Sequence, residues 1–207
     1  HYPLRRQRQM CIRDSSLSAC NSIGAKIKKL NYLINVAGAT KGGSFLKLKD
    51  NVWDDGFNLK FKAAVRLSRN FWKTLRRNKG KVINIGGGAA RNPSHTFMIG
   101  GAVNSALNNF SRALAMQGKI DKVSVSIIHP GMTLTSRLKK LLETDSKILK
   151  KSVKQILKQR CKADKIKRPT KPEEVAKLVY SLIRSSNLNF NNIAIDGGKI
   201  KRLKTHI

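Results

Sequence analysis

The sequence predicts an α/β fold in which helices cover a doubly wound parallel sheet. Short apolar runs each end in a glycine-containing bend, and helical patterns separate these runs. Repeated strand, bend and helix is typical of a parallel sheet, because each parallel connection crosses back over the sheet. Hydrophobic residues make up 40% of the 207 residues, which is enough to bury a substantial core in one domain.

The apolar runs place four predicted strands, at 30–36, 81–85, 123–129 and 193–195. Each strand is followed by a bend, at 37–39, 86–88, 130–133 and 196–198. Ligands of open α/β sheets bind beyond the carboxyl ends of the strands. The bends are therefore the expected ligand-binding positions.

Between the strands, apolar residues recur at helical spacing. One helix is expected over 50–78, with Gly80 as its stop signal, and another over 99–118. A last helix has its own start signal, since Thr170 is a suitable N-cap and Glu173 a suitable partner in a capping box.

The charge of the chain is extreme, at a formal net value of +32. Such a charge favours nonspecific polyanion binding at low salt. The lysines are nevertheless spread over the whole chain, without a zinc-finger, helix-turn-helix or RNA-binding signature and without interleaved aromatic residues. We therefore expect no specific nucleic-acid partner, and a basic polyanion-binding protein is only the third interpretation.

Composition also bears on location. The sequence contains no run of 18 apolar residues and no apolar signal-peptide core near its start, so no membrane association is expected. The three cysteines, Cys11, Cys20 and Cys161, have no Cys-x-x-Cys spacing, and no metal site is expected. A cytoplasmic location fits this cysteine usage best.

The chain divides into three parts. Residues 1–15 differ in composition from the rest and are predicted to be a non-native or disordered leader, with a native basic arm as the alternative. Residues 16–198 form the predicted domain, and 199–207 a basic tail. Within the domain, 137–171 carries fourteen Lys and Arg against three acids and has the spacing of two amphipathic helices, which predicts a basic helical lid or simply a solvated face.

Several short motifs then follow one another in a distinctive order. Asn-Val-Ala-Gly at 35–38 follows the first strand, and Pro-Gly-Met-Thr at 130–133 follows the third. Asn58 lies in the long helix, and segments 172–176 and 196–198 close the series. In this order the motifs resemble those of the short-chain dehydrogenase/reductase family.

The resemblance implies a Rossmann-like sheet and NAD or NADP as cofactor. Asn58 would hold a proton-relay water, and six further residues would line the cofactor: Asn35, Ala37, Gly38, Pro130, Gly131 and Thr133. It also implies that the family's amino-terminal strands and pyrophosphate-binding turn are missing from this chain. The strand at 30–36 would then be an apolar edge strand.

The reactive residues of the family are absent at their expected positions. The family uses a serine and a Tyr-x-x-x-Lys motif, and these positions fall on Gly87, Gly100 and Asn104. A tyrosine acts there as the general acid or base, with the lysine ammonium lowering its pKa. Glycine carries no exchangeable side-chain proton, so the catalytic acid is unidentified. Four polar residues nearby are available as replacements: Ser94, His95, Thr96 and Ser105. Of these, His95 has a simpler interpretation as an ordinary loop histidine.

Two functions follow from the resemblance. The first is an oxidoreductase that transfers hydride between a nicotinamide and a carbonyl or hydroxyl substrate, with an acyl thioester as one option. The second is a non-catalytic binding or scaffolding protein with the same fold. The expected partners are a small-molecule substrate, which a basic lid would favour if it is anionic, and a second copy of the chain bound through helices 50–78 and 99–118.

Overall fold

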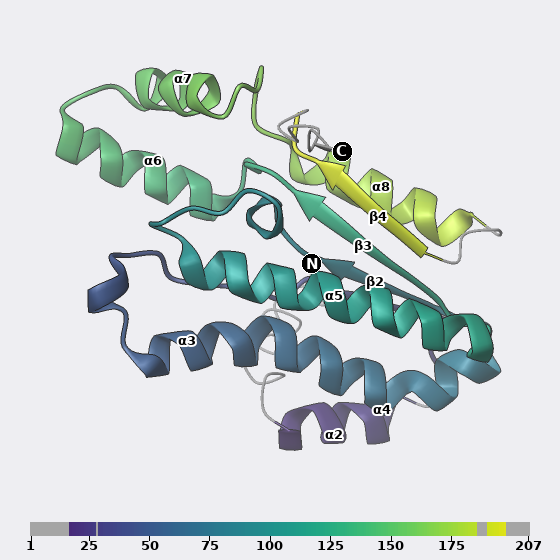
Figure 1. Ribbon diagram of the computed structural model, residues 1–207. Helices are drawn as coiled ribbons and strands as arrows, with labels where there is room; N and C mark the ends of the chain where they lie inside the picture. The colour runs from purple at the N-terminus through teal and green to yellow at the C-terminus, as the bar shows by residue number, and fades with distance from the viewer. Residues whose placement is uncertain (1–16, 28, 186–189, 198–207) are drawn as a thin grey trace, which may run out of the picture.

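The computed structural model describes residues 17–27, 29–185 and 190–197. Four parallel strands form one sheet in the order β1-β2-β3-β4 (Figure 1). Their bounds are Tyr32–Asn35, Lys81–Ile85, Ser124–Pro130 and Phe190–Ile195. The Rossmann-like α/β fold with a parallel sheet is therefore confirmed. The leader predicted at 1–15 and the tail predicted at 199–207 lie outside the described residues.

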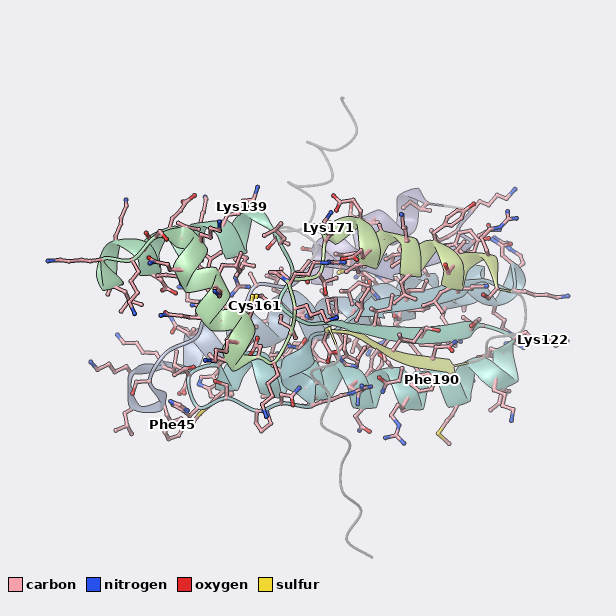
Figure 2. The ribbon with its side chains drawn as sticks, turned by 90° about the horizontal axis from the view of Figure 1, so that it is seen from above. Phe45, Lys122, Lys139, Cys161, Lys171 and Phe190 are labelled. Carbon is pink, nitrogen blue, oxygen red and sulfur yellow. The ribbon has the colours of Figure 1, made fainter. Side chains whose placement is uncertain are left out.

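Helices cover both faces of this sheet. On one face lie α3 (Asp50–Gly56), α4 (Ala63–Arg77) and α5 (Met98–Asp121), and α8 (Pro172–Arg184) lies on the other (Figures 1 and 2). Helix α2 (Leu17–Lys26) packs against α4. In the part of the chain that the structure describes, none of the helices is long and apolar enough to cross a membrane.

Apolar side chains of the strands alternate between the two faces of the sheet, and each face packs against helices in its own cluster. Val82 and Val125 pack with Phe71 and Leu75 on the α4 side. Ile83 and Ile128 pack with Leu182 on the α8 side. Among the described strands, β1 pairs only with β2, and its Tyr32 and Ile34 side chains are 44% and 38% exposed.

The long helix predicted over 50–78 is helical over 50–77 but not uniformly α-helical. Between α3 and α4 lies η2, a π-helical turn over Phe57–Lys62. Such turns are rare and are found frequently at functional sites. The helix ends before Gly80, where a Cβ atom would lie 2.6 Å from the Asn31 carbonyl oxygen.

The segment 137–171 contains two helices, α6 (Ser136–Leu149) and α7 (Val153–Ala163). They pack on each other through Leu138, Leu142 and Ile156. The strand arrows point toward this pair in Figure 1, and in Figure 2 the labelled Lys139 and Cys161 lie at the opposite end of the molecule from Lys122 and Phe190. The two helices therefore stand beyond the carboxyl ends of the strands.

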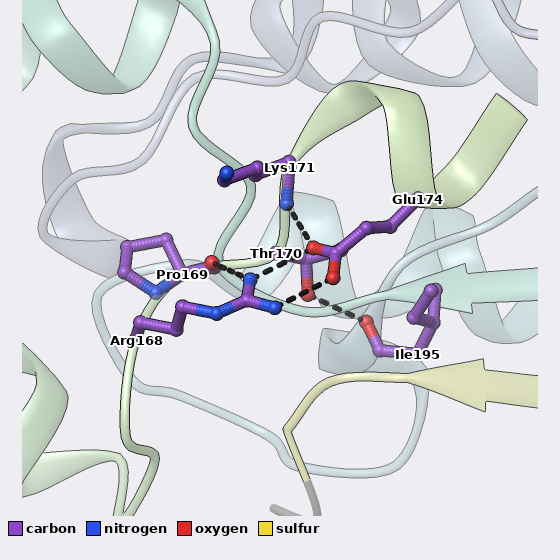
Figure 3. Close-up of polar contacts among 6 residues, drawn as sticks. All are labelled: Arg168, Pro169, Thr170, Lys171, Glu174 and Ile195. Carbon is purple, nitrogen blue, oxygen red and sulfur yellow. Dashed lines mark hydrogen bonds and ion pairs between the residues drawn. The ribbon is translucent and has the colours of Figure 1, made fainter.

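The predicted capping box of α8 is wrong by one residue. The N-cap is Lys171, and its backbone N–H donates to the Glu174 carboxylate at 2.7 Å (Figure 3). Arg168 donates two hydrogen bonds to the same carboxylate, at 2.8 and 2.6 Å. Thr170 instead donates its hydroxyl to the Ile195 carbonyl oxygen at 3.1 Å, which ties the start of α8 to the end of β4.

Candidate active site

A cavity of about 590 Å³ opens at the carboxyl ends of the strands. This volume lies within the ~300–1,000 Å³ typical of small-molecule sites. Much of its wall is backbone of glycine-rich bends, at Gly38, Gly86, Gly87, Gly88 and Gly131. Its polar side chains come from six separate segments: Lys60, Asn92, Ser94, Asn104, Thr133, Thr135, Arg160, Asp164 and Asp196.

Four of the six residues predicted to line a cofactor lie in the cavity wall: Gly38, Pro130, Gly131 and Thr133. Asn35 and Ala37 are not part of the described wall. Asn35 instead donates to the side-chain oxygen of Asn84 at 2.8 Å, and Asn84 donates to Ser111 at 2.8 Å. Asn35 therefore ties β1 to β2 below the cavity.

The bend after β3 brings backbone close to backbone. A Cβ atom at Gly131 would lie 2.8 Å from the Asp196 Cα, so only glycine fits there without a shift. The Thr133 hydroxyl donates to the Gly131 carbonyl oxygen at 3.0 Å. Backbone hydrogen bonds from Leu134 to Thr170 and from Thr170 to Met132, both 2.8 Å, hold this bend against the start of α8.

The three family positions for the reactive residues lie around one bend. Gly87 and Asn104 both line the cavity, and a Cβ atom at Gly87 would lie 2.9 Å from the Asn104 side-chain nitrogen. Gly100 is not in the described wall, because the ring of Phe97 fills the space beside it. A Cβ atom at Gly100 would lie 1.9 Å from that ring. A larger side chain at position 100 would have to displace Phe97.

Lys60 is a cavity residue that the sequence analysis did not predict, as is Asn92. Asn58 is not among the described wall residues, whereas Lys60, two residues later in η2, is. Its ammonium donates to the Gly86 carbonyl oxygen at 2.8 Å. A Cβ atom at Gly38 would lie 2.9 Å from the Lys60 Cδ, so the lack of a side chain at Gly38 makes room for the lysine side chain.

Burial, together with the charge of Arg137, lowers the pKa of Lys60 to about 8. Desolvation disfavours the ammonium because a charge loses more on leaving water than a neutral amine does. The sequence carried a signal for this. Phe57, Lys60, Phe61 and Ala64 occupy successive i, i+3, i+4 and i+7 positions, so the lysine falls on an otherwise apolar stripe.

His129 lies fully buried beneath the Gly87 bend. Its Nδ1 is 3.2 Å from the Gly87 carbonyl oxygen and its Nε2 is 3.2 Å from the Asn108 side-chain oxygen. Burial lowers the pKa of His129, and the charges of Arg91 and Lys60 act in the same direction against the Gly87 hydrogen bond. The imidazole is therefore neutral near pH 7 and supports the bend.

The four polar residues considered as replacements for the missing catalytic groups differ in whether they reach the cavity. Ser94 lines the cavity and its hydroxyl lies 3.0 Å from that of Thr96. His95 is exposed and is not in the described wall. Ser105 is exposed and donates to the Ala90 carbonyl oxygen at 3.3 Å. Of these four, Ser94 alone is in the described wall.

Two asparagines of this wall each have a buried amide atom without a described partner. The Asn92 Nδ2 donor and the Asn104 Oδ1 acceptor have no hydrogen-bond partner among the described residues. Both asparagines line the cavity. Leaving a buried polar atom unpaired costs about 1–3 kcal/mol, so such atoms are usually paired with a bound group or solvent.

Comparisons with known proteins agree with this fold. A profile of the short chain dehydrogenase family matches residues 9–146. An uncharacterized oxidoreductase of Bacillus subtilis, YvrD, is 28% identical over 202 residues, which cover 91% of this chain and 77% of the relative. The chain therefore belongs to the short chain dehydrogenase family of oxidoreductases.

Solved structures extend the agreement to the whole described sheet. L-Sorbose reductase from Gluconobacter frateurii, complexed with NADPH and L-sorbose, superposes with a TM-score of 0.85 at 25% identity over 92% of this chain and 75% of that one. An NADPH-bound oxidoreductase from Pseudomonas aeruginosa, described as containing an atypical catalytic center, gives 0.78 at 19% identity over 91% and 74%. The second likeness shows the fold alone, and the NADPH bound to L-sorbose reductase agrees with the NAD or NADP cofactor predicted from the sequence.

Proposed function

We propose that the protein is an NAD(P)-dependent oxidoreductase that interconverts a carbonyl and a hydroxyl group in this cavity. The observation that carries the proposal is the glycine-walled cavity at the carboxyl ends of the strands, whose lining includes Asn92 and Asn104, each with a buried amide atom that has no described hydrogen-bond partner. Polar groups of this kind are expected where a ligand makes the missing hydrogen bonds.

The wall residues fit the nicotinamide end of such a cofactor. When bound, the cofactor supplies or accepts a hydride. Gly38 and Gly131 contribute backbone to the wall, and their lack of a side chain leaves room for the Lys60 chain and for Asp196. Thr133 has its hydroxyl fixed on the Gly131 carbonyl oxygen at 3.0 Å, and the ring of Pro130 restricts the backbone where the turn begins. These residues bind and orient, and none of them supplies a proton.

The proposal extends to three finer points. An anionic substrate fits the charge of 137–171, where α6 and α7 stand beyond the strand ends. Self-association through the long helices fits the exposed Met116 and Ile120 on α5, which are 74% and 76% exposed. A cytoplasmic location fits the cysteine usage of the sequence. Light scattering coupled to size-exclusion chromatography tests the oligomer directly.

A second function is favoured by the glycines at 87 and 100 and the amide at 104. These residues supply no general acid, which suits a member of the family that binds nucleotide or a partner without turnover. In that case NADPH would raise the melting temperature, because a ligand that binds only the folded state stabilises it. Catalysis would not accompany the stabilisation.

One experiment separates the two functions. The purified chain is mixed with NADPH or NADH and a panel of ketoses and β-ketoacyl thioesters, and absorbance at the reduced-nicotinamide band is followed. Oxidation of the cofactor that depends on both protein and carbonyl supports the oxidoreductase. Thermal stabilisation by NADPH without oxidation across the panel supports the binding protein, and the absence of both contradicts either function.

A further inference from the structure

Lys60 combines features that no other described cation of the cavity combines. The cavity wall holds two cationic side chains among the described residues, Lys60 and Arg160. Arg160 is already paired with the Asp145 carboxylate at 2.5 Å. Lys60 has a single described hydrogen bond, to the Gly86 carbonyl oxygen, although an ammonium carries three donors. Two of its N–H groups are therefore left for another acceptor.

The position of this ammonium is fixed from three directions. The lysine chain passes over Gly38, its head group bonds Gly86, and its backbone lies in the π-helical turn η2. Across the same bend, a Cβ atom at Gly87 would contact the Asn104 amide. The bend at Gly86 and Gly87 therefore has a charged donor from η2 and an uncharged amide from α5 beside it.

We propose that Lys60 is the catalytic proton donor, delivering its proton to the carbonyl oxygen of the substrate. The inference rests on the proposed oxidoreductase function, since only reduction of a carbonyl calls for this proton. The proposal takes the proton donor from η2, because the glycine at position 100 has no side chain that could donate a proton. A donor from a different helix also explains why Gly87 and Gly100 can be glycine without loss of the chemistry.

The step balances as follows for reduction. The carbonyl carbon gains hydride from the cofactor, which is thereby oxidised by two electrons, and the carbonyl π pair moves onto oxygen. An N–H bond of the Lys60 ammonium breaks, its proton forms the new O–H bond, and its electron pair stays on the neutral amine. Water then returns a proton to the amine. In the direction of alcohol oxidation, the neutral amine accepts the hydroxyl proton.

The electrostatic surroundings suit this exchange. Charged and titratable groups reach this region from several elements: Arg137 from α6, His129 from β3, Arg160 and Asp164 from α7 and its end, and Asp196 after β4. Burial and Arg137 lower the pKa of Lys60 to about 8, so the amine is mostly protonated at neutral pH and is a stronger acid than an ordinary lysine. A general acid works best when its pKa lies near the operating pH.

Two substitutions separate proton donation from mere positive charge. K60M removes the amine, whereas K60R keeps a charge that does not titrate below about pH 12. Both should lower kcat at least ~100-fold, as expected for loss of a general acid, while the NADPH dissociation constant measured by fluorescence stays within about threefold. The matched control is K62M, which changes an exposed lysine of the same turn and should behave as wild type.

The pH dependence and a labelling measurement complete the test. Wild-type carbonyl reduction should fall above about pH 8, and K60R should lose this dependence. Acylation of Lys60 by trace acetic anhydride, followed by peptide mapping, should be suppressed by NADPH, while that of Lys62 is unchanged. An active wild type with an equally active K60R, or Lys60 acylation indifferent to NADPH, overturns the assignment. A wild type without turnover contradicts the proposed oxidoreductase function instead.

Discussion

Two lysines lie at opposite ends of the sheet, and both have lowered pKa values because burial disfavours their charge. Lys81 begins β2 and donates to three carbonyl oxygens at the end of α8, those of Leu182, Ile183 and Ser185. Lys60 lies near the carboxyl end of the same strand and has one carbonyl acceptor, on Gly86.

This difference distinguishes a structural cation from a chemical one. The three acceptors of Lys81 use all the donors of its ammonium and satisfy carbonyls that a helix end leaves unpaired. They also place a positive charge at the negative end of the helix dipole. Lys60 has no comparable set of described partners and faces a cavity. A buried cation whose donors are not all used is available to a ligand.

The largest expected effect is on stability. K81M should lower the free energy of unfolding by about 3 kcal/mol, because the last carbonyls of α8 lose their charged donor. K60M should not lower it, because removing a poorly partnered buried charge relieves a desolvation cost. Urea denaturation measures both, with K73M on the exposed face of α4 as the control. Equal losses for K60M and K81M would break the comparison.

A smaller effect should appear in the pH dependence of stability. The pKa of Lys60 is about 8 in the folded protein and 10.5 as its ordinary value, so between these pH values the unfolded chain binds more protons. Stability contributed at this site therefore rises with pH over that window. The difference in unfolding free energy between wild type and K60M should shift in favour of wild type by about 2 kcal/mol from pH 8 to 10.5. A flat difference would show that Lys60 titrates normally.

Exchanging the charge across the bend gives a third test. N104K would place a second ammonium near Lys60 and should cost about 1–2 kcal/mol of unfolding free energy through like-charge repulsion and burial. K60N/N104K moves the charge from η2 to α5 and should recover at least half of that loss. The unfolding free energies of wild type, K60N, N104K and K60N/N104K, measured by denaturation, form a double-mutant cycle. Additive effects would mean that the two positions do not interact.

The smallest expected effect concerns the ion pair between Arg168 and Glu174 at the start of α8 (Figure 3). Hydrogen bonds from Arg168 and from the Lys171 backbone lower the pKa of Glu174 to about 2 from 4.5. The stability from this carboxylate is present above pH 4.5 and is lost as the pH falls toward 2. E174Q should flatten the melting temperature in this range slightly, with E173Q as control. An unchanged acid slope would mean that solvent screens the pair fully.

Periodicity and turn residues were sufficient to predict the sheet. The apolar runs at 81–85 and 123–129 differ from β2 and β3 by at most one residue at each end. Burial on both faces forces such runs to be apolar throughout, and glycine or proline must follow where the chain turns. These are local requirements, so a single sequence displays them.

The cavity was predicted only in part. Gly38 and Gly131 were predicted because their motifs resemble those of the family, and such short motifs are visible in a single sequence. Lys60 was missed because its significance depends on η2 and on Gly38, which is distant in sequence and leaves room for its side chain. The displacement of Thr170 from the N-cap had a similar cause, since its hydroxyl bonds Ile195 on a strand 25 residues away.

Direct titration of Lys60 tests the central claim most simply. Lysines are reductively methylated with ¹³C-formaldehyde, the Lys60 dimethylamine signal is assigned by its loss in K60R, and its chemical shift is followed from pH 6 to 12. A midpoint near 8, well below those of exposed lysines, is the result expected for a proton donor in this cavity. A midpoint near the ordinary 10.5 would contradict that role for Lys60.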